Sequence, residues 1–179
     1  MTEYTEVFDS LAGILTYPAA DFAERLQRCK TAVDALGPDR GKIPQRIDEF
    51  IDGLKNSSTG EMEELYTRTF DINPVSSLEV GWHLHGETYE RGAFLVTMRD
   101  LLRRCSIEES TELPDHLTHV LQAVGRMDPL EASEFISKNV LKAVNKMLEG
   151  FTDQSNPYEN ILLAVKELLA LYATSHVGV

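Results

Sequence analysis

Apolar residues recur every three or four positions along almost the whole chain, and nowhere do apolar and polar residues alternate with a period of two. Because an α-helix turns once every 3.6 residues, this spacing gives each segment one apolar face. We find no internal repeat at periods of about 20–50 residues. The pattern therefore predicts an all-α fold, a single compact bundle of about seven to nine helices over residues 1–179.

Proline, glycine and short polar runs divide this pattern into helices. The expected breaks are at 17–18, 37–38, 56–60, 71–77, near Gly86, and at 106–111, 128–129 and 150–157. Thr59 is expected to cap the helix that runs to Phe70. Pro114 suits the first position of a later helix, where Asp115 would complement the helix dipole. The final segment, 158–175, is apolar on nearly every side and is expected at the centre of the bundle.

The charge balance restricts the partners of this chain. It has 179 residues, of which 42% are hydrophobic, and 29 acidic residues against 17 basic ones give a net charge of −12. That much apolar material supports a sizeable core and excludes disorder for most of the chain. A surface this acidic repels nucleic-acid phosphates and anionic membranes, whereas it attracts a basic partner.

The cysteines and the amino terminus indicate a cytoplasmic protein. Cys29 and Cys105 match no metal or redox spacing, and the acidic residues 1–6 lack the basic and apolar regions of a secretory signal. No apolar run approaches about 18 residues, so we expect no membrane insertion. Cys105, on an apolar helical face, is interpreted as a small packed hydrophobe.

Sequence motifs for catalysis or cofactor binding are absent. The segment 37–42 resembles a phosphate loop, but it is one residue short and Ile43 replaces the required Ser or Thr. His83 and His85, two apart on a helix, point in different directions. His116 and His119 share a face and could bind zinc with neighbouring carboxylates, although we favour surface histidines there. We predict no catalytic residues, no metal and no cofactor.

Two further features leave two interpretations open. Trp82, outside any apolar stripe, is either a core residue or a partner contact. The connection 106–125 carries Glu108, Glu109, Glu112 and Asp115 without Lys or Arg, so it is either a solvated loop or an acidic rim for a basic peptide.

Several segments together resemble the NarJ/TorD/DmsD family of redox-enzyme maturation chaperones, which includes the nitrate reductase delta subunit. They are Leu15-Thr16-Tyr17-Pro18, Tyr66-x-x-x-Phe70-Asp71, Ser77-Leu78, the run from His83 to Gly92 (HLHGETYERG), and Glu112-Leu113-Pro114-Asp115-His116-Leu117. The resemblance covers Phe8 to Val124. It departs from the nitrate-reductase branch at Trp82, Tyr89, His116 and Thr118, and looks closer to chaperones of other type II molybdoenzymes related to dimethyl sulfoxide reductase.

The resemblance implies a cytoplasmic chaperone that is not an enzyme. Such a protein binds the leader or N-terminal segment of the catalytic subunit of one molybdopterin-dependent oxidoreductase, and it supports cofactor insertion before assembly or Tat export. The leader-binding groove that it implies here is lined by His85, Gly86, Arg91, Gly92, Glu112, Pro114, Asp115 and His116. We expect Trp82 and Tyr89, although they depart from the nitrate-reductase branch, to contact the leader as well.

Physical chemistry suggests how these residues would act. Glu112 and Asp115 are expected to meet leader arginines, and Trp82 to hold its apolar part, so that Asp115→Lys should weaken binding. His116, near a helix N-terminus, should be neutral. Gly86 and Gly92 are interpreted as a sharp turn and a close helix approach. Arg91 is expected to contact the leader or to tie that turn to a carboxylate.

Two rival interpretations remain open. One is a helical adaptor without a redox client, which gene neighbourhood would distinguish. The other is a small enzyme that uses His83, His85, His116 or His119, which metal analysis would reveal. We expect a monomer, with 56–60 and 150–157 as the hinge regions if a domain-swapped dimer forms.

Overall fold

The computed structural model describes residues 3–38, 40–152 and 155–175. Ten α-helical segments and two short π-helical segments make up its regular structure, in the order α1 (Glu3–Ile14), α2 (Phe22–Ala35), α3 (Ile43–Leu54), α4 (Thr59–Tyr66), η1 (Thr67–Asp71), α5 (Val80–His85), α6 (Tyr89–Arg104), α7 (Leu117–Val124), α8 (Pro129–Phe135), η2 (Ile136–Val140), α9 (Leu141–Glu149) and α10 (Tyr158–Ser175).

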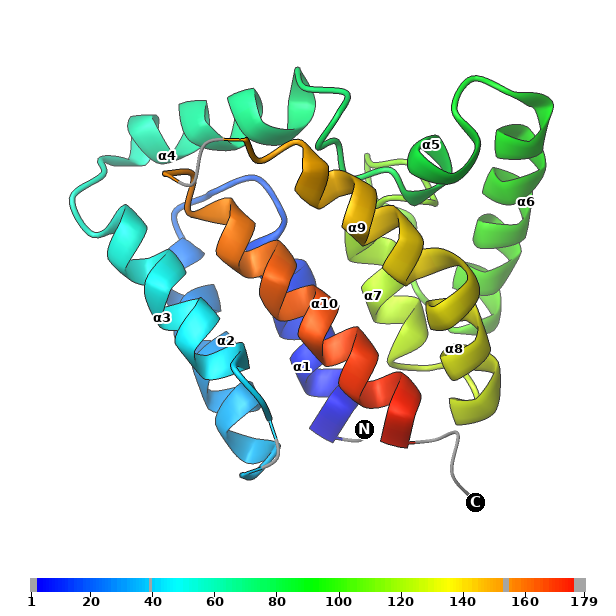
Figure 1. Cartoon of the computed structure of the whole chain (residues 1–179), viewed down its shortest axis with the longest axis horizontal. Helices are drawn as coiled ribbons and strands as arrows, with labels where there is room; N and C mark the ends of the chain where they lie inside the picture. The colour runs from blue at the N-terminus through cyan, green and yellow to red at the C-terminus, as the bar shows by residue number, and fades with distance from the viewer. Residues whose placement is uncertain (1–2, 39, 153–154, 176–179) are drawn as a thin grey trace.

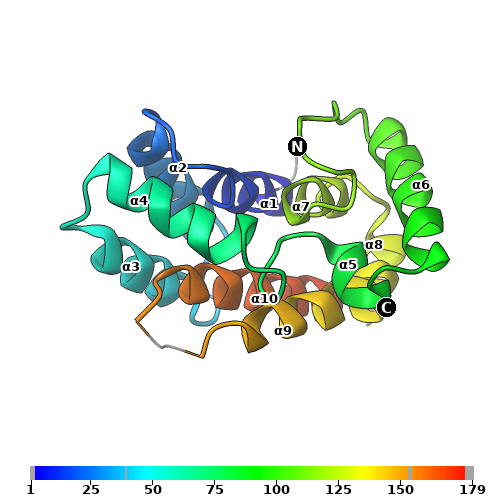
Figure 2. The ribbon, with the colours of Figure 1, turned by 90° about the horizontal axis from the view of Figure 1, so that it is seen from above.

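The helices pack in two layers, which Figure 2 shows from above. One layer contains α2, α1 and α7, and the other contains α3, α10, α9 and α8, with α10 packed against α1, α3, α8 and α9. Helix α4 crosses the top of both layers, while α5 and α6 form a hairpin at one edge (Figure 1). The central position expected for the last helix is confirmed.

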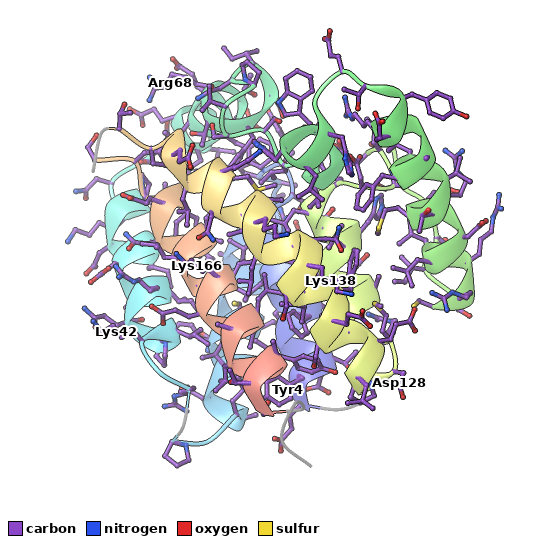
Figure 3. The ribbon with its side chains drawn as sticks, turned by 45° about the vertical axis from the view of Figure 1, so that its right-hand side comes forward. Tyr4, Lys42, Arg68, Asp128, Lys138 and Lys166 are labelled. Atoms are coloured by element: carbon purple, nitrogen blue, oxygen red, sulfur yellow. The ribbon has the colours of Figure 1, made fainter. Side chains whose placement is uncertain are left out.

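The two layers bury one continuous apolar core. Tyr158, at the start of α10, is fully buried and its ring packs against Phe50, Tyr66 and Phe70 at centroid distances of 5.0–5.9 Å. Charged side chains such as Lys42 and Lys138 lie on the outside (Figure 3). Each helix therefore turns its apolar stripe inward, as the spacing predicts.

The all-α prediction is confirmed. Because α8, η2 and α9 form one continuous run, the ten α-segments make nine helices in the described residues. The π turns were not predicted: Ile72 N donates to Thr67 O at 3.1 Å, which inserts one extra residue into the last turn of the α4 run.

Two expected helix starts are wrong. Ser58, not Thr59, caps α4: its hydroxyl accepts from Glu61 N at 3.3 Å, and Glu61 Oε2 accepts from Ser58 N at 2.8 Å in a reciprocal capping box. Helix α7 starts at Leu117, so Pro114 and Asp115 lie in the preceding turn and not in its first turn. Of the loop expected at 150–157, residues 153–154 lie outside the described residues.

Candidate functional site: an acidic face with a buried carboxylate behind it

A sharp turn at Gly86 separates α5 from α6. Gly86 has φ of +62°, a conformation that glycine adopts without strain, so the expected turn is confirmed. Gly92 does not serve as a close helix approach, because a Cβ added there would meet nothing within 4 Å. The close approach is instead at Gly81, where an added Cβ would lie 2.6 Å from Asp115 Oδ2.

A short backbone pairing brings two distant segments together. Val80 N donates to the backbone oxygen of Asp115 at 2.9 Å, and Leu117 N donates to Leu78 O at 2.7 Å, around an antiparallel bridge between Glu79 and His116. The turn before α7 is thereby fixed against the start of α5. This pairing brings the Ser77-Leu78 motif into contact with the motif at residues 112–117.

Asp115 lies behind this pairing and not on an acidic rim. Its side chain is 0% exposed, and Oδ2 accepts from Gly81 N at 2.9 Å and lies 3.9 Å from Arg91 Nε. Burial raises the pKa of this carboxyl, although Arg91 opposes the shift. The expectation that Asp115 is displayed in an acidic rim is therefore wrong, and Asp115→Lys would bury a new charge rather than only test binding.

Arg91 and Trp82 complete this cluster. The Arg91 guanidinium lies 5.6 Å from the centre of the Trp82 ring, and Trp82 Nε1 donates to Pro74 O at 2.9 Å. Trp82 is half-buried and not a core residue. Arg91 thus ties the turn to a carboxylate, as one of its two interpretations requires.

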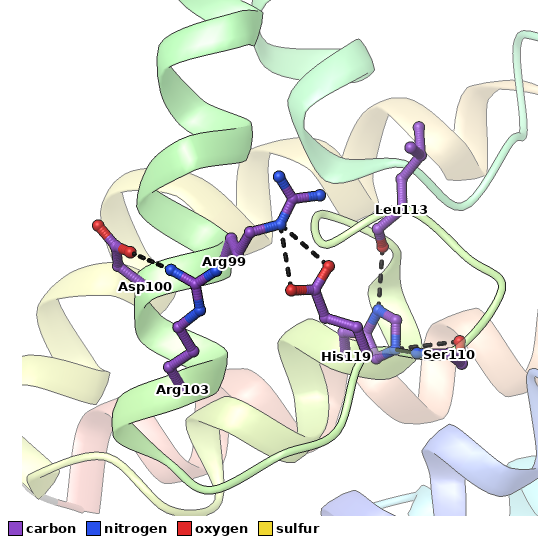
Figure 4. Close-up of polar contacts among 7 residues, drawn as sticks. Arg99, Asp100, Arg103, Ser110, Leu113 and His119 are labelled. Carbon is purple, nitrogen blue, oxygen red and sulfur yellow. Dashed lines mark hydrogen bonds and ion pairs between the residues drawn. The ribbon is translucent and has the colours of Figure 1, made fainter.

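The two histidines before and in α7 are buried, contrary to the surface position expected for them. His116 is the N-cap of α7, where Nδ1 accepts from Thr118 N at 3.4 Å, and burial lowers its pKa to about 4. It is therefore neutral, as expected, with burial as the main cause. His119 Nε2 accepts from Ser110 N at 3.3 Å, and His119 Nδ1 lies 2.9 Å from Leu113 O. These two contacts hold the loop that precedes α7 in place (Figure 4).

Three carboxylates gather beside this cluster, two from the ends of the connection between η1 and α5 and one from the loop before α7. They are Asp71 at the end of η1, Glu79 before α5 and Glu112 in the loop before α7. Burial and the negative charges of Asp71 and Glu79 raise the pKa of Glu112. Burial and the charge of Glu79 likewise raise the pKa of Asp71, although Thr67 opposes the shift through a hydrogen bond. In the described residues, none of the three has an ion pair with Lys or Arg.

Exposed apolar side chains adjoin these carboxylates. Ile72 follows Asp71 and is 71% exposed, and Leu113 follows Glu112 and is 45% exposed. Tyr17 is 48% exposed and lies edge-on to Tyr66, at 5.6 Å between ring centres. We call Asp71, Glu79, Glu112, Ile72, Leu113 and Tyr17 the acidic face. Its carboxylates come from η1, the loop before α5 and the loop before α7, and Tyr17 comes from the connection between α1 and α2.

The remaining predicted residues lie around this face. Pro114 is buried in the turn, His85 packs against Phe94 at 5.6 Å between ring centres, and Tyr89 is 90% exposed at the start of α6. Trp82, Arg91 and Asp115 are brought together, and so are His116 and Glu112, with His116 Nε2 4.0 Å from Glu112 Oε2. Sequence reasoning missed Asp71 and Glu79; their signal is that residues 69–90 contain no Lys or Arg.

The described residues give little support to two other kinds of site, a metal centre and a reactive cysteine. Among the described residues, no group of three or more His, Cys, Asp or Glu side chains is arranged to hold a metal ion. Cys105 is half-buried, and burial raises the pKa of its thiol. None of the helices that the structure describes combines the length and apolar character needed to cross a bilayer.

Comparison with known families identifies the class of protein. The family model for the nitrate reductase delta subunit matches residues 33–162, well over half of the chain. That range runs from α2 into α10 and contains every residue of the acidic face except Tyr17, together with the Asp115 cluster. The chain belongs to the nitrate reductase delta subunit family.

Two curated relatives match this chain, and both have the same name. They are the nitrate reductase molybdenum cofactor assembly chaperones NarJ of Escherichia coli strain K12 and of Escherichia coli O157:H7. Each is 26% identical to this chain over 125 residues, which is 69% of this chain and 53% of the relative. The chain therefore spans about half the length of the curated relatives that it matches.

Proposed function

We propose that this protein is a chaperone, and not an enzyme, for the catalytic subunit of a molybdopterin-dependent oxidoreductase. It would bind the leader or N-terminal segment of that subunit in the cytoplasm, and it would support cofactor insertion before assembly or Tat export. Family membership supports the class of function, and the named relatives are molybdenum cofactor assembly chaperones of nitrate reductase.

The acidic face is the observation that carries this proposal. Asp71, Glu79 and Glu112 repel one another, and the described residues supply no Lys or Arg to neutralise them. A basic segment would relieve that repulsion, and its apolar part would cover Ile72 and Leu113. A leader that is basic and partly apolar has this chemistry, and it would order on binding.

This proposal modifies the residue roles expected from the sequence. Glu112 keeps the role of a direct ligand for leader arginines, and Asp71 and Glu79 join it. Trp82, His85 and Tyr89 would contact the segment beyond the carboxylates, whereas Gly86, Pro114 and His116 hold the turns that carry them. A protein with this role needs no cofactor of its own.

Calorimetry with synthetic N-terminal segments tests the proposal. The segments are those of each molybdoenzyme catalytic subunit encoded in the same organism, and we expect one to bind. Glu112→Lys should weaken that binding by about tenfold or more, because it places a like charge opposite the segment's arginines. Glu3→Lys, an exposed residue at the opposite end of the molecule, is the matched control and should leave binding unchanged (Figure 1).

Two outcomes would contradict the proposal. Equal affinity in the Glu112→Lys and Glu3→Lys variants would remove the acidic face from the binding site. Failure of every segment to bind, together with affinity purification from cells that express the clients but yield only unrelated proteins, would favour a helical adaptor.

A further inference from the structure

The buried pair of Arg91 and Asp115 is loosely made. Its shortest separation, Arg91 Nε to Asp115 Oδ2, is 3.9 Å, whereas an arginine–carboxylate hydrogen bond normally spans about 2.7–2.9 Å. Among the described residues, Arg91 Nε and Asp115 Oδ1 are both buried without a hydrogen-bond partner. The pair therefore balances charge but leaves hydrogen-bonding capacity unused on both sides.

The arginine is the outer member of this pair. The Asp115 side chain is 0% exposed and the Arg91 side chain is 23% exposed. Asp115 is held in place from behind, because its Oδ2 accepts from Gly81 N and its backbone oxygen accepts from Val80 N. Arg91 is held mainly through the face of the Trp82 ring, at 5.6 Å. Arg91 is consequently the more easily displaced of the two.

Asp115 is also continuous with the acidic face. Glu79 belongs to that face and directly precedes Val80, whose N–H donates to the backbone oxygen of Asp115. The negative charge of Glu79 acts on Asp115 as it acts on Asp71 and Glu112. A cation bound at the acidic face would therefore also be attracted by the carboxylate that Arg91 covers.

We propose that Arg91 is an internal competitor for the bound segment: it occupies Asp115 in the free protein, and a guanidinium of the segment takes its place. This inference rests on the proposed function, because it concerns the same surface. Asp115 is then a second carboxylate subsite, which Arg91 closes in the free protein. A guanidinium can bond to both carboxylate oxygens at once and so use the Oδ1 that Arg91 leaves unpaired, whereas a lysine ammonium has no such fork.

The two possible roles of Arg91, competing with the segment or tethering α6, predict opposite effects of Arg91→Ala on the binding affinity. If Arg91 competes, its removal opens the subsite and tightens binding, because the closed state no longer lowers the apparent affinity. If Arg91 only tethers α6 to the turn before α7, its removal loosens the site and weakens binding. The effect of Arg91→Ala on affinity therefore decides between the two roles.

The experiment uses a synthetic peptide with two adjacent arginines followed by leucines, and its versions with glutamine or lysine in place of arginine. Calorimetry compares the wild-type chain, Arg91→Ala and Arg99→Ala, a control on the same helix whose guanidinium pairs with Glu109 at 3.0 Å. We expect Arg91→Ala to bind the arginine peptide roughly three- to tenfold more tightly. We expect no gain with the glutamine peptide, a smaller gain with the lysine peptide, and no change in Arg99→Ala.

Equal or weaker binding by a folded Arg91→Ala variant would overturn the inference. If that variant does not fold, the Arg91 Nε–H resonance of the wild-type chain is followed by NMR during the peptide titration. A shift on binding supports displacement, and an unmoved resonance overturns it. A client segment that binds without any gain in Arg91→Ala would refute only this inference, whereas failure of both client segments and probe to bind would refute the proposed function as well.

Discussion

At position 81 the backbone of α5 passes so close to its neighbours that only a hydrogen atom fits. A Cβ there would lie 2.6 Å from Asp115 Oδ2 and 2.8 Å from Phe94 Cδ1. Asp115 is fully buried and cannot move away freely. We predict that Gly81→Ala destabilises the fold by about 1–3 kcal/mol, the usual cost of overpacking, measured as a lower urea midpoint.

Gly92→Ala is the matched control for this prediction. The added methyl group meets nothing within 4 Å, and the residue lies inside α6. Alanine favours a helix over glycine by about 0.5–1 kcal/mol, so this variant should be slightly more stable than the wild type. A similar loss of stability in both variants would show that the close approach at Gly81 has no effect.

His116 provides a pH-dependent test of burial. Its pKa falls from 6.5 to about 4 in the folded chain, so the unfolded chain binds the proton more readily between these values. Stability contributed by the neutral ring is therefore present above pH 6.5 and is lost as the pH falls toward 4. His116→Asn keeps a side chain that can cap α7 but cannot titrate.

We therefore expect His116→Asn to lose less stability than the wild type between about pH 7 and pH 4.5, by an amount on the order of 2 kcal/mol. Urea unfolding of both chains at pH 7 and at about pH 4.5 measures this difference in stability loss. The raised pKa values of Asp71, Glu112 and Asp115 act in the opposite direction, because acid relieves their cost, but they are common to both chains. Identical pH dependence in the two chains would contradict the prediction.

At the level of the elements, the α4 run depends on its capping box. Ser58 and Glu61 satisfy each other's backbone N–H groups, and α4 then carries η1 and Asp71 to the acidic face. Ser58→Ala should cost about 0.5–2 kcal/mol, which corresponds to a fall in melting temperature of roughly 2–4 °C per kcal/mol in a chain of this size. Thr59→Ala, at the first helical position, should change it little, and the reverse ranking would disprove the assignment of the cap.

The helices themselves could be predicted from the sequence because their burial is periodic. The segment 158–175 indicated the central helix because it is apolar on nearly every side, and the Gly86 break indicated the turn between α5 and α6. The residue that caps α4 could not be predicted, because Ser58 and Thr59 are adjacent and chemically equivalent as caps. The π turn in η1 could not be predicted either, because the insertion of one residue leaves the apolar pattern almost unchanged.

The candidate site was predictable only in part. Local patterns indicated Trp82, Glu112, Asp115 and the Gly86 turn, and the family resemblance added Arg91. The burial of Asp115 and the gathering of Asp71 with Glu79 depend on the pairing of residues 78–80 with 115–117. That contact joins segments far apart in the chain, and nothing in either segment alone specifies its partner.

For the whole molecule, the net charge of −12 and the acidic face make distinguishable contributions to binding. At physiological salt the Debye length is about 8 Å, so only charges close to a bound segment act strongly, whereas all of them act at low salt. We predict that the association rate of an arginine-bearing segment falls steeply as salt rises from about 0.05 to about 0.5 M.

Glu112→Gln should flatten that dependence and slow association even at physiological salt. Glu3→Gln removes the same charge from the opposite end of the molecule, so it should act only at low salt, where screening is weak. Stopped-flow fluorescence of Trp82, the single tryptophan of the chain, provides the signal beside the site. Equal effects of the two substitutions at physiological salt would mean that net charge, and not the acidic face, guides the segment.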